Sequence, residues 1–321
     1  VIVVMGSTDW AGGTPSENTA ADTSASNEDG MYRNIARHLL STNAPILKLK
    51  IDRNGQAKFI ESPTYPNGTI VTQPSGNDSV FRQLSNTIGY VNHGLLKKSD
   101  LPLLREQING CKGLIIDMRT PPKATIGLGF AHYLLDTGKP FIKFTHSSLS
   151  EAGTFRYTPN SLVGLENSEY FRGPVVILVN ESTQSSAEFY TMAYQQAPYA
   201  WTIGSQTAGA DGNIAMIQLP FDYKVLISSL GIYYPDGSET QQVGIRIDQE
   251  VRPTLKGIRE GRDEQLEKAV EYINKSEFSK PTQLSKNDRL YKFIIPFVII
   301  CFGIIAKYSR RNYGRKRLRK Y

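Results

Sequence analysis

The chain has 321 residues and a formal net charge of +7, with 37 lysines and arginines against 30 acidic residues. This length accommodates about two domains with additional segments. From Lys307 onward the chain carries basic residues and no acidic one, and these account for the whole positive excess, so the charge does not indicate nucleic-acid binding. The two cysteines, Cys111 and Cys301, lie in very different settings and do not indicate a disulfide framework.

Known signatures of cofactor or metal sites do not occur in the sequence. It contains no phosphate-binding loop, no dinucleotide fingerprint and no cysteine–histidine cluster. His132 and His146 have no partners at metal-ligand spacing, and we interpret both as structural residues. We therefore expect a protein that needs no cofactor and no metal.

The first part of the chain is polar and begins with Val1 rather than methionine, so we expect a fragment or a processed chain. Residues 7–30 are dominated by Ser, Thr, Ala, Asn, Asp and Gly, with no apolar periodicity after Trp10. Such a composition cannot bury enough surface to order itself. We expect residues 1–26 to be a disordered N-terminal segment.

A helix and a hairpin are predicted for residues 27–61. Ser26 or Asn27 can cap the helix, and residues 46–60 contain two short strands around a turn. Residues 62–86 contain several turn formers in quick succession and are predicted to be a linker.

The main domain is predicted to cover residues 87–275. Strands are expected at 88–91, 113–118 and 141–144, and helices at 101–108 and 127–135. Asp117 and Arg119 end the second of these strands, and we interpret them as a structural ion pair. Residues 153–170 combine glycines and aromatic residues, and we expect them to form a long loop.

The stretch 174–213 organises this domain. It opens with a continuous apolar run at 175–179, typical of a strand buried on both faces, and continues through a polar elbow into a helix. Ser185 stands where the strand turns into the helix, and free amides and the helix dipole at such a place can stabilise an oxyanion. Ser185 and Glu188 also form a capping-box pattern, so an ordinary helix start is an equally open interpretation.

Two further elements are predicted after this stretch. Residues 224–229 and 232–234 are expected to pair as a hairpin, with the turn sequence 235–237 after them. Residues 263–272 have the periodicity of a closing amphipathic helix.

Several collinear motifs resemble the C-terminal processing, or tail-specific, serine peptidases, a family that includes the tricorn core. The motifs cover residues 88–274 and match in order and spacing. They are Asn180, Ser185 to Glu188, Gly204-Ser205-Gln206-Thr207-Ala208-Gly209, Tyr234-Pro235-Asp236-Gly237 and Gly244-Ile245-Arg246-Ile247-Asp248. The resemblance implies an α/β (α+β) fold with a ClpP/crotonase-like peptidase core.

The resemblance also implies roles for single residues. Ser185 falls on the nucleophile of the family. The branch with a Ser–Lys dyad has its lysine where this chain has Ala210, which cannot accept a proton. The tricorn-like branch uses a histidine near His93, one residue earlier than in this chain, and orients it with a glutamate in the region of Glu239. His93 is therefore the candidate base and Glu239 its candidate orienting group.

The oxyanion hole implied by the resemblance uses backbone amides. In many relatives a glycine pair follows the Asp-x-Arg strand, whereas this chain has Lys123 and Ala124 at those positions. We expect the amides of Ser186 and Lys123 to form the hole. Residues 27–61 resemble the end of a PDZ-like module, whose other strands would have to come from residues 1–5.

The end of the chain has a different character. Residues 276–289 are predicted to be a linker, and residues 290–308 are apolar enough to be read as a transmembrane helix of about 28 Å. A buried C-terminal helix is the alternative. The basic tail 309–321 is expected to stay cytoplasmic, with the peptidase domain on the other side of the membrane.

These features lead to three functional hypotheses. The first is a membrane-anchored, extracytoplasmic (periplasmic) serine endopeptidase of the cell envelope that acts on unstructured or C-terminal segments of proteins through Ser185. The second is a catalytically impaired relative that binds peptides, which Ala210 favours. The third is an anchored scaffold. No nucleic-acid partner is expected.

Overall fold

The computed structural model describes residues 3–7, 25–38, 44–53, 56–66, 79–85, 87–148, 150–151, 153–228 and 230–275. The chain divides into the units Val1–Glu277 and Phe278–Tyr321, and the described residues all belong to the first. The predicted transmembrane helix and basic tail therefore lie outside the described residues. Within the described ranges, no helix combines the length and the apolar character that a membrane crossing requires.

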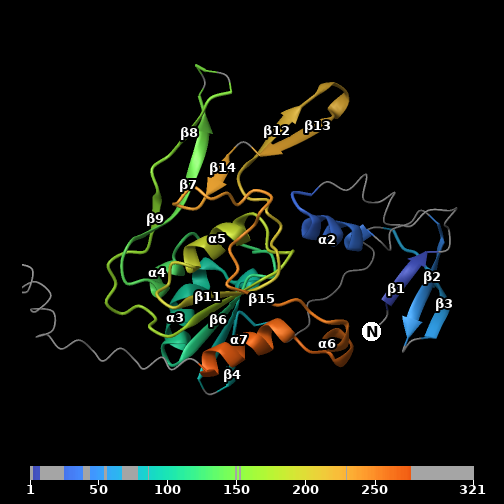
Figure 1. Cartoon of the computed structure of the whole chain (residues 1–321), viewed down its shortest axis with the longest axis horizontal. Helices are drawn as coiled ribbons and strands as arrows, with labels where there is room; N and C mark the ends of the chain where they lie inside the picture. The colour runs from blue at the N-terminus through green and yellow to red at the C-terminus, as the bar shows by residue number, and fades with distance from the viewer. Residues whose placement is uncertain are drawn as a thin grey trace, which may run out of the picture. The chain divides into compact units, whose positions relative to one another are not determined.

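A six-stranded sheet forms the centre of the main domain (Figure 1). Five strands are parallel and β4 pairs antiparallel at one edge. The order across the sheet is β15 (Gln249–Glu250), β11 (Ala200–Gly204), β10 (Val175–Val179), β6 (Gly113–Asp117), β5 (Ile88–Asn92) and β4 (Phe81–Ser85). The predicted mixed α/β core is thus present.

Strand β10 shows why the apolar run is continuous. Val175, Ile177 and Val179 belong to the core on one face of the sheet, which also contains residues of α3 (Leu101–Asn109), α4 (Ala131–Leu134) and α5 (Ser186–Tyr194). Val176 and Leu178 belong to the core on the other face, with residues of α7 (Glu264–Lys275). Because successive side chains of a strand point to opposite faces, a strand covered on both sides needs an apolar residue at every position.

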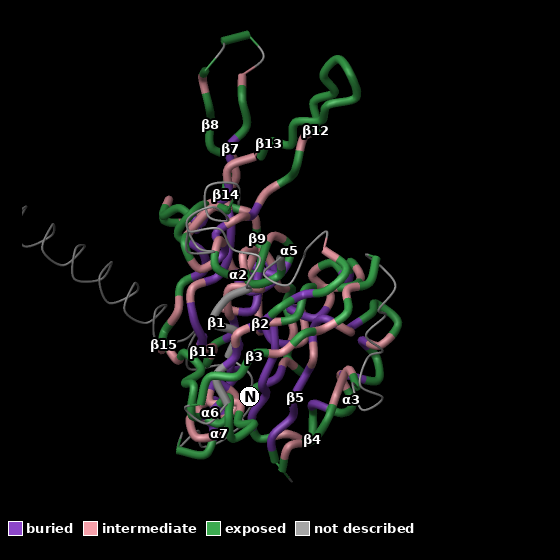
Figure 2. Tube along the Cα trace, turned by 90° about the vertical axis from the view of Figure 1, so that its right-hand side faces the viewer, coloured by how far each residue is buried: buried purple, intermediate pink, exposed green. Residues whose placement is uncertain are grey.

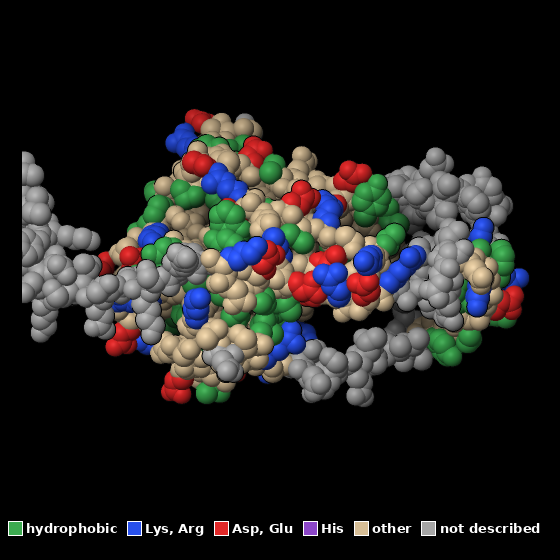
Figure 3. Space-filling view, turned by 60° about the horizontal axis from the view of Figure 1, so that its bottom comes forward, with side chains coloured by type: hydrophobic (Ala, Val, Ile, Leu, Met, Phe, Trp, Pro, Cys, Tyr) green, Lys and Arg blue, Asp and Glu red, His purple; other side chains and the backbone are tan. Residues whose placement is uncertain are grey.

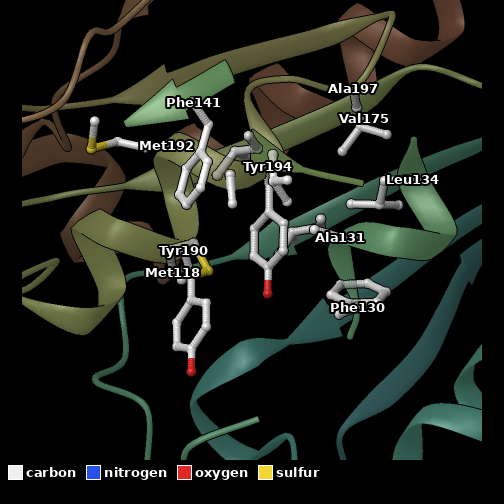
Figure 4. Close-up of a cluster of buried hydrophobic side chains, with 14 of the residues drawn as sticks. Met118, Phe130, Ala131, Leu134, Phe141, Val175, Tyr190, Met192, Tyr194 and Ala197 are labelled. Carbon is white, nitrogen blue, oxygen red and sulfur yellow. The ribbon is translucent and has the colours of Figure 1, made fainter. Parts of the chain in front are cut away.

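The part of the core that contains α5 is rich in aromatic side chains. Tyr190 and Tyr194 stack with their ring planes 12° apart, and Figure 4 shows both hydroxyls pointing to the same side. Phe130 packs edge-on against Tyr194, with ring centroids 5.4 Å apart. Large rings with one polar atom each fill this region.

The two long hairpins extend away from the central sheet and are exposed toward their tips, whereas the central strands are buried (Figure 2). The first contains β7 (Lys139–Ser147) and β8 (Phe155–Tyr157), and β7 also pairs with β9 (Ser161–Val163) and β14 (Gly231–Tyr233). The second contains β12 (Ile214–Gln218) and β13 (Lys224–Ser228).

These pairings correct two sequence predictions. Residues 153–170 contain two short strands that pair with β7, and so are not simply a long loop. Strand β13 pairs with the preceding β12, while the strand predicted at 232–234 pairs with β7. An apolar segment predicts a strand but does not select its partner, since pairing depends on which chain segment is brought beside it.

The N-terminal part also differs from the prediction. Val3–Ser7 forms strand β1, which pairs with β2 (Ile46–Arg53), and β2 pairs with β3 (Gln56–Pro63). The prediction that all of 1–26 is disordered is therefore wrong for this strand, whose β-branched residues favour an extended backbone. The predicted linker 62–86 is likewise wrong at its end, because β4 already belongs to the main sheet.

Helix α2 (Glu28–His38) begins at Asn27, whose side-chain oxygen accepts a hydrogen bond from the Gly30 amide at 2.9 Å. The side-chain amide of Asn27 donates to Thr207 O at 2.8 Å. Helix α2 is thereby attached to the loop after β11. Whether residues 27–61 form part of a PDZ-like module remains a prediction.

The Asp117–Arg119 pair holds the main domain together at one end of the sheet. The Arg119 guanidinium donates two hydrogen bonds to Asp117, the shorter at 2.6 Å, and two of 2.8 Å to Asp263. The structural interpretation of this pair is confirmed, and Asp263 extends it to the start of α7. On the face drawn in Figure 3, acidic and basic side chains are interspersed, consistent with a nearly neutral folded part.

Candidate active site

The carboxyl ends of the parallel strands meet at one edge of the sheet, and the elbow after β10 is fixed there. Asn180 accepts a hydrogen bond from the Ser182 amide at 2.9 Å. The Thr183 hydroxyl accepts from the Asn180 amide at 3.1 Å and donates to Met118 O at 3.0 Å. The polar residues of the elbow therefore replace the sheet hydrogen bonds that end at Val179, and they tie the elbow to the loop after β6.

Ser185 has an unusual backbone conformation, with φ 54° and ψ −120°. A residue with a side chain adopts positive φ at a cost of roughly 1–3 kcal/mol, so the surroundings must impose it. The residue is partly exposed and directly precedes α5. A sharp strand-to-helix turn of this kind presents a nucleophilic serine at the end of a sheet in other hydrolases.

Glu188 imposes this conformation. The side chain is fully buried, and its two carboxylate oxygens accept four hydrogen bonds. One oxygen binds the Thr207 hydroxyl at 2.6 Å and the Gly209 amide at 2.9 Å. The other binds the amides of Ser185 and Ala210, both at 3.1 Å. Burial raises the pKa of Glu188, and these hydrogen bonds act in the opposite direction.

The loop after β11 is therefore held against the elbow. Gly209 has φ 58°, and a side chain there would meet the backbone of Gln242 and the side chain of Asn27. Glycine is required at such a left-handed, crowded position. The capping box predicted from the sequence is present. The Glu188 carboxylate also joins the start of α5 to the loop after β11.

The two predicted oxyanion donors are in different situations. Ser186 is the first residue of α5, where amides lack acceptors within the helix, and its side chain is exposed. The Lys123 amide donates to Gly94 O at 3.1 Å. In this structure the Lys123 amide is therefore engaged with Gly94 O, and its place in the oxyanion hole stays a prediction. Gly94 packs closely against Thr120 in the same loop.

His93 lies in the aromatic part of the core. It follows the last residue of β5, is 1% exposed, and its Nε2 lies 2.8 Å from the Tyr194 hydroxyl. Its Nδ1 is buried and has no hydrogen-bond partner among the described residues. Burial lowers the pKa of His93 to about 4, so the imidazole is neutral at pH 7. Within the described ranges, the hydrogen bond of the His93 side chain is with Tyr194, and none joins it to Ser185.

Comparisons with known proteins identify a family to which part of the chain is similar. Residues 96–251 match the model of peptidase family S41. This region, just under half of the chain, is similar to peptidase family S41. The members are serine-type peptidases, and the resemblance to tail-specific peptidases inferred from the motifs is confirmed.

Solved structures show the S41 fold at low sequence identity. A candidate peptidase from Parabacteroides merdae is 21% identical with a TM-score of 0.55, over 60% of this chain and 63% of that chain. Mature CPAF is 14% identical with a TM-score of 0.63, over 86% of this chain and 82% of that chain. CPAF complexed with lactacystin is 13% identical with a TM-score of 0.61, over 86% and 83%. A search of curated proteins found no match.

Glu239, the predicted orienting group, lies in the segment that follows β14. It forms an isolated bridge with Tyr233 and is exposed. It lines a cavity of about 490 Å³ together with Tyr157 and Leu230, at the base of the hairpins. No hydrogen bond joins Glu239 to His93 within the described part of the chain, so the two predicted partners are not brought together as a pair in this conformation.

Sequence reasoning missed one buried acid next to the S41 lysine position. Asp211 directly follows Ala210 and is 6% exposed. The available signal was an acidic residue in a loop that otherwise consists of small and polar neutral residues. Among the residues that the structure describes, no three His, Cys, Asp or Glu side chains form a group that could hold a metal ion.

Proposed function

We infer that this chain is a serine endopeptidase of the tail-specific type whose nucleophile is Ser185. The observation that supports this most strongly is the backbone of Ser185, with φ 54° and ψ −120° at the amino end of α5. The Glu188 carboxylate maintains this conformation through the Ser185 amide. Strain retained at a partly exposed serine at the carboxyl edge of a parallel sheet favours a catalytic role over a simple helix cap.

The reaction follows from this geometry. The Ser185 oxygen attacks the carbonyl carbon of a peptide bond, and the amides at the start of α5, including that of Ser186, stabilise the negative oxygen. A cavity of about 430 Å³ opens between the loops after β5 and β6, lined by Leu95, Lys97 and Lys123 among others. It offers room for side chains of an extended substrate.

The proposal is tested by comparing Ser185→Ala with the wild-type chain on an unstructured fluorogenic peptide. We expect turnover to fall by at least about 10³-fold, because the acyl-enzyme cannot form. Ser168→Ala is the matched control, since Ser168 lies on an exposed loop. Unchanged turnover in Ser185→Ala would reject the proposal.

A second candidate is a peptide-binding relative without peptidase activity. Ala210 at the lysine position and the engagement of His93 by Tyr194 favour it. Labelling with a fluorophosphonate discriminates between the two, because this reagent reacts only with an activated serine. Peptide binding without labelling would support the binding module.

Substrate class and location form the remaining part of the proposal. The family resemblance and the apolar segment 290–308 with its basic tail support an extracytoplasmic peptidase that is anchored in the membrane and acts on unstructured or C-terminal protein segments. Alkaline carbonate extraction of membranes that contain the full chain tests the anchor. Release of the chain into the soluble fraction would contradict it.

A further inference from the structure

The Ala210–Asp211 peptide group touches the proposed nucleophile. The carbonyl oxygen of Ala210 accepts a hydrogen bond from the Ser185 amide at 3.1 Å. The nitrogen of Asp211 belongs to the same peptide group as this carbonyl. The hydrogen bond therefore joins the main chain of Ser185 to the peptide group that leads into Asp211. The fold therefore places an acidic residue directly after the residue whose carbonyl binds the Ser185 amide, at the position that follows the family's lysine.

The carboxyl group of Asp211 is incompletely satisfied. One oxygen accepts from the Gly212 amide at 2.7 Å, whereas Oδ2 is buried and has no hydrogen-bond partner among the described residues. An unpaired buried carboxylate oxygen is unfavourable, so its presence calls for an explanation.

The surroundings of Asp211 also set its protonation. Burial raises the pKa of Asp211 to about 7, the Gly212 hydrogen bond opposes this, and the charge of Glu188 raises it further. Glu188, on α5, is the charged group set against it. On the other side of Gly212 lie Leu230 and Ile232, which bring no ionisable side chain. A group that titrates near neutral pH is suited to accept and return a proton.

The other candidate positions for a base either lack a titratable atom or are already hydrogen-bonded. Ala210 has no titratable atom, and the Nε2 of His93 is bound to the Tyr194 hydroxyl. The Glu188 oxygens already accept four hydrogen bonds. Among the residues that the structure describes, Asp211 Oδ2 is a buried acceptor without a hydrogen-bond partner.

We propose that Asp211 accepts the proton of the Ser185 hydroxyl and thereby replaces the family's lysine in this chain. As the Ser185 oxygen bonds to the substrate carbonyl carbon, its proton passes to Asp211 Oδ2 and the C=O electron pair moves to the carbonyl oxygen. When the oxyanion collapses and the C–N bond breaks, Asp211 returns the proton to the leaving amine. Water then repeats the sequence on the acyl-enzyme. The Ser185–Asp211 contact forms when substrate is bound, as catalytic hydrogen bonds commonly tighten at that stage.

This inference rests on the proposed function, so the experiment separates the two. The full chain is assayed with the fluorogenic peptide across pH 5 to 9, alongside Asp211→Asn, Asp211→Glu and the exposed control Asp222→Asn. Asparagine retains an acceptor for the Gly212 amide, and melting curves of each variant establish that it is folded.

We expect wild-type kcat/KM to rise with pH through about 7, because the base acts in its deprotonated form. Asp211→Asn should lower kcat by about 10²- to 10⁴-fold with little change in KM, and should abolish this rise. Asp211→Glu should restore part of kcat with a displaced midpoint, which a merely structural role would not produce. Asp222→Asn should match the wild type.

The outcomes that overturn the assignment are distinct. An active chain whose kcat/KM shows no ionisation between pH 6 and 8, or whose folded Asp211→Asn variant retains kcat within threefold, overturns the role of Asp211 and leaves Ser185 in place. A wild-type chain that neither cleaves the peptide nor reacts with a fluorophosphonate overturns both proposals.

Discussion

The amide of Ser185 donates to the carbonyl oxygen of Ala210 at 3.1 Å and also to the Glu188 carboxylate at the same distance. This relationship keeps position 210 beside the proposed nucleophile even though alanine has no acid–base chemistry. The framework that would hold a dyad lysine is therefore preserved without the lysine. Because alanine at position 210 cannot accept a proton, the base for Ser185 has to be another side chain.

Replacement of Glu188 by glutamine should disturb this framework. The side-chain amide of glutamine would present hydrogens to backbone amides that are themselves donors, so at least one buried hydrogen bond would be lost. We expect the free energy of unfolding to fall by about 2–3 kcal/mol and peptide turnover to fall with it. Urea unfolding measures the first effect, with Glu169→Gln on the surface as the control. An unfolding free energy equal to that of the wild type would contradict a stabilising role for the Glu188 hydrogen bonds.

Asp211→Asn should stabilise the folded chain at high pH while it reduces activity. The folded pKa of Asp211, about 7, lies above the ordinary value of 3.8, so the native state binds more protons than the unfolded state between these pH values. The stabilising effect of the protonated carboxyl is complete below pH 3.8 and is lost as the pH rises through 7. Asparagine avoids this loss.

The gain from Asp211→Asn relative to wild type should therefore grow from pH 4 to pH 8, by up to about 4 kcal/mol. Unfolding in denaturant at several pH values measures it. Asp222→Asn, on an exposed turn, should show no such trend. A gain that is independent of pH would argue against a buried, titrating Asp211.

His93 should contribute the opposite pH dependence. Burial places its folded pKa at about 4, below the ordinary value of 6.5. Its neutral form therefore stabilises the fold fully above pH 6.5, and this contribution is lost as the pH falls toward 4. In His93→Phe the decrease in stability between these pH values should be smaller than in wild type by up to about 3 kcal/mol. The exposed His146 provides the control substitution His146→Phe, and equal pH dependence in wild type and His93→Phe would refute the prediction.

Arg119 should be important for stability rather than for catalysis. Its guanidinium binds Asp117, which is 6% exposed, and Asp263 at the start of α7. Arg119→Met would leave the Asp117 carboxylate buried without its partner, at a cost of about 3 kcal/mol or more. Arg119→Lys keeps the charge but cannot reproduce the paired hydrogen bonds of the guanidinium. Its stability should therefore lie between those of the wild type and Arg119→Met. Thermal unfolding distinguishes the three proteins, and equal melting temperatures would contradict this prediction.

Local patterns in the sequence were sufficient for the parts of the fold that depend on nearby residues. The strand at 175–179, the elbow and the helix that starts at Ser186 follow from side-chain periodicity and from turn residues within about twenty positions. The same holds for the hairpin of β2 and β3. The collinear motifs identified the family for a similar reason, since each is a short segment with its own backbone requirement.

Contacts between distant segments could not be derived in this way. His93 is paired with Tyr194, 101 positions later, and the Lys123 amide is paired with Gly94 O. Strand β13 pairs with β12 rather than with the segment that follows it. In each case the sequence offers several partners of the same chemical type, and only packing selects one of them.

The sequence by itself determined the family, the α/β core and the position of Ser185, because these are encoded by residue types at short spacing. The tertiary structure alone decided the surroundings of that serine. Packing of the loop after β11 onto α5 saturates Glu188, encloses Asp211 with one oxygen unpaired, and leaves His93 in the aromatic core. Burial and unpaired polar atoms arise only when separate segments pack together, so they cannot be predicted from any one segment of the sequence.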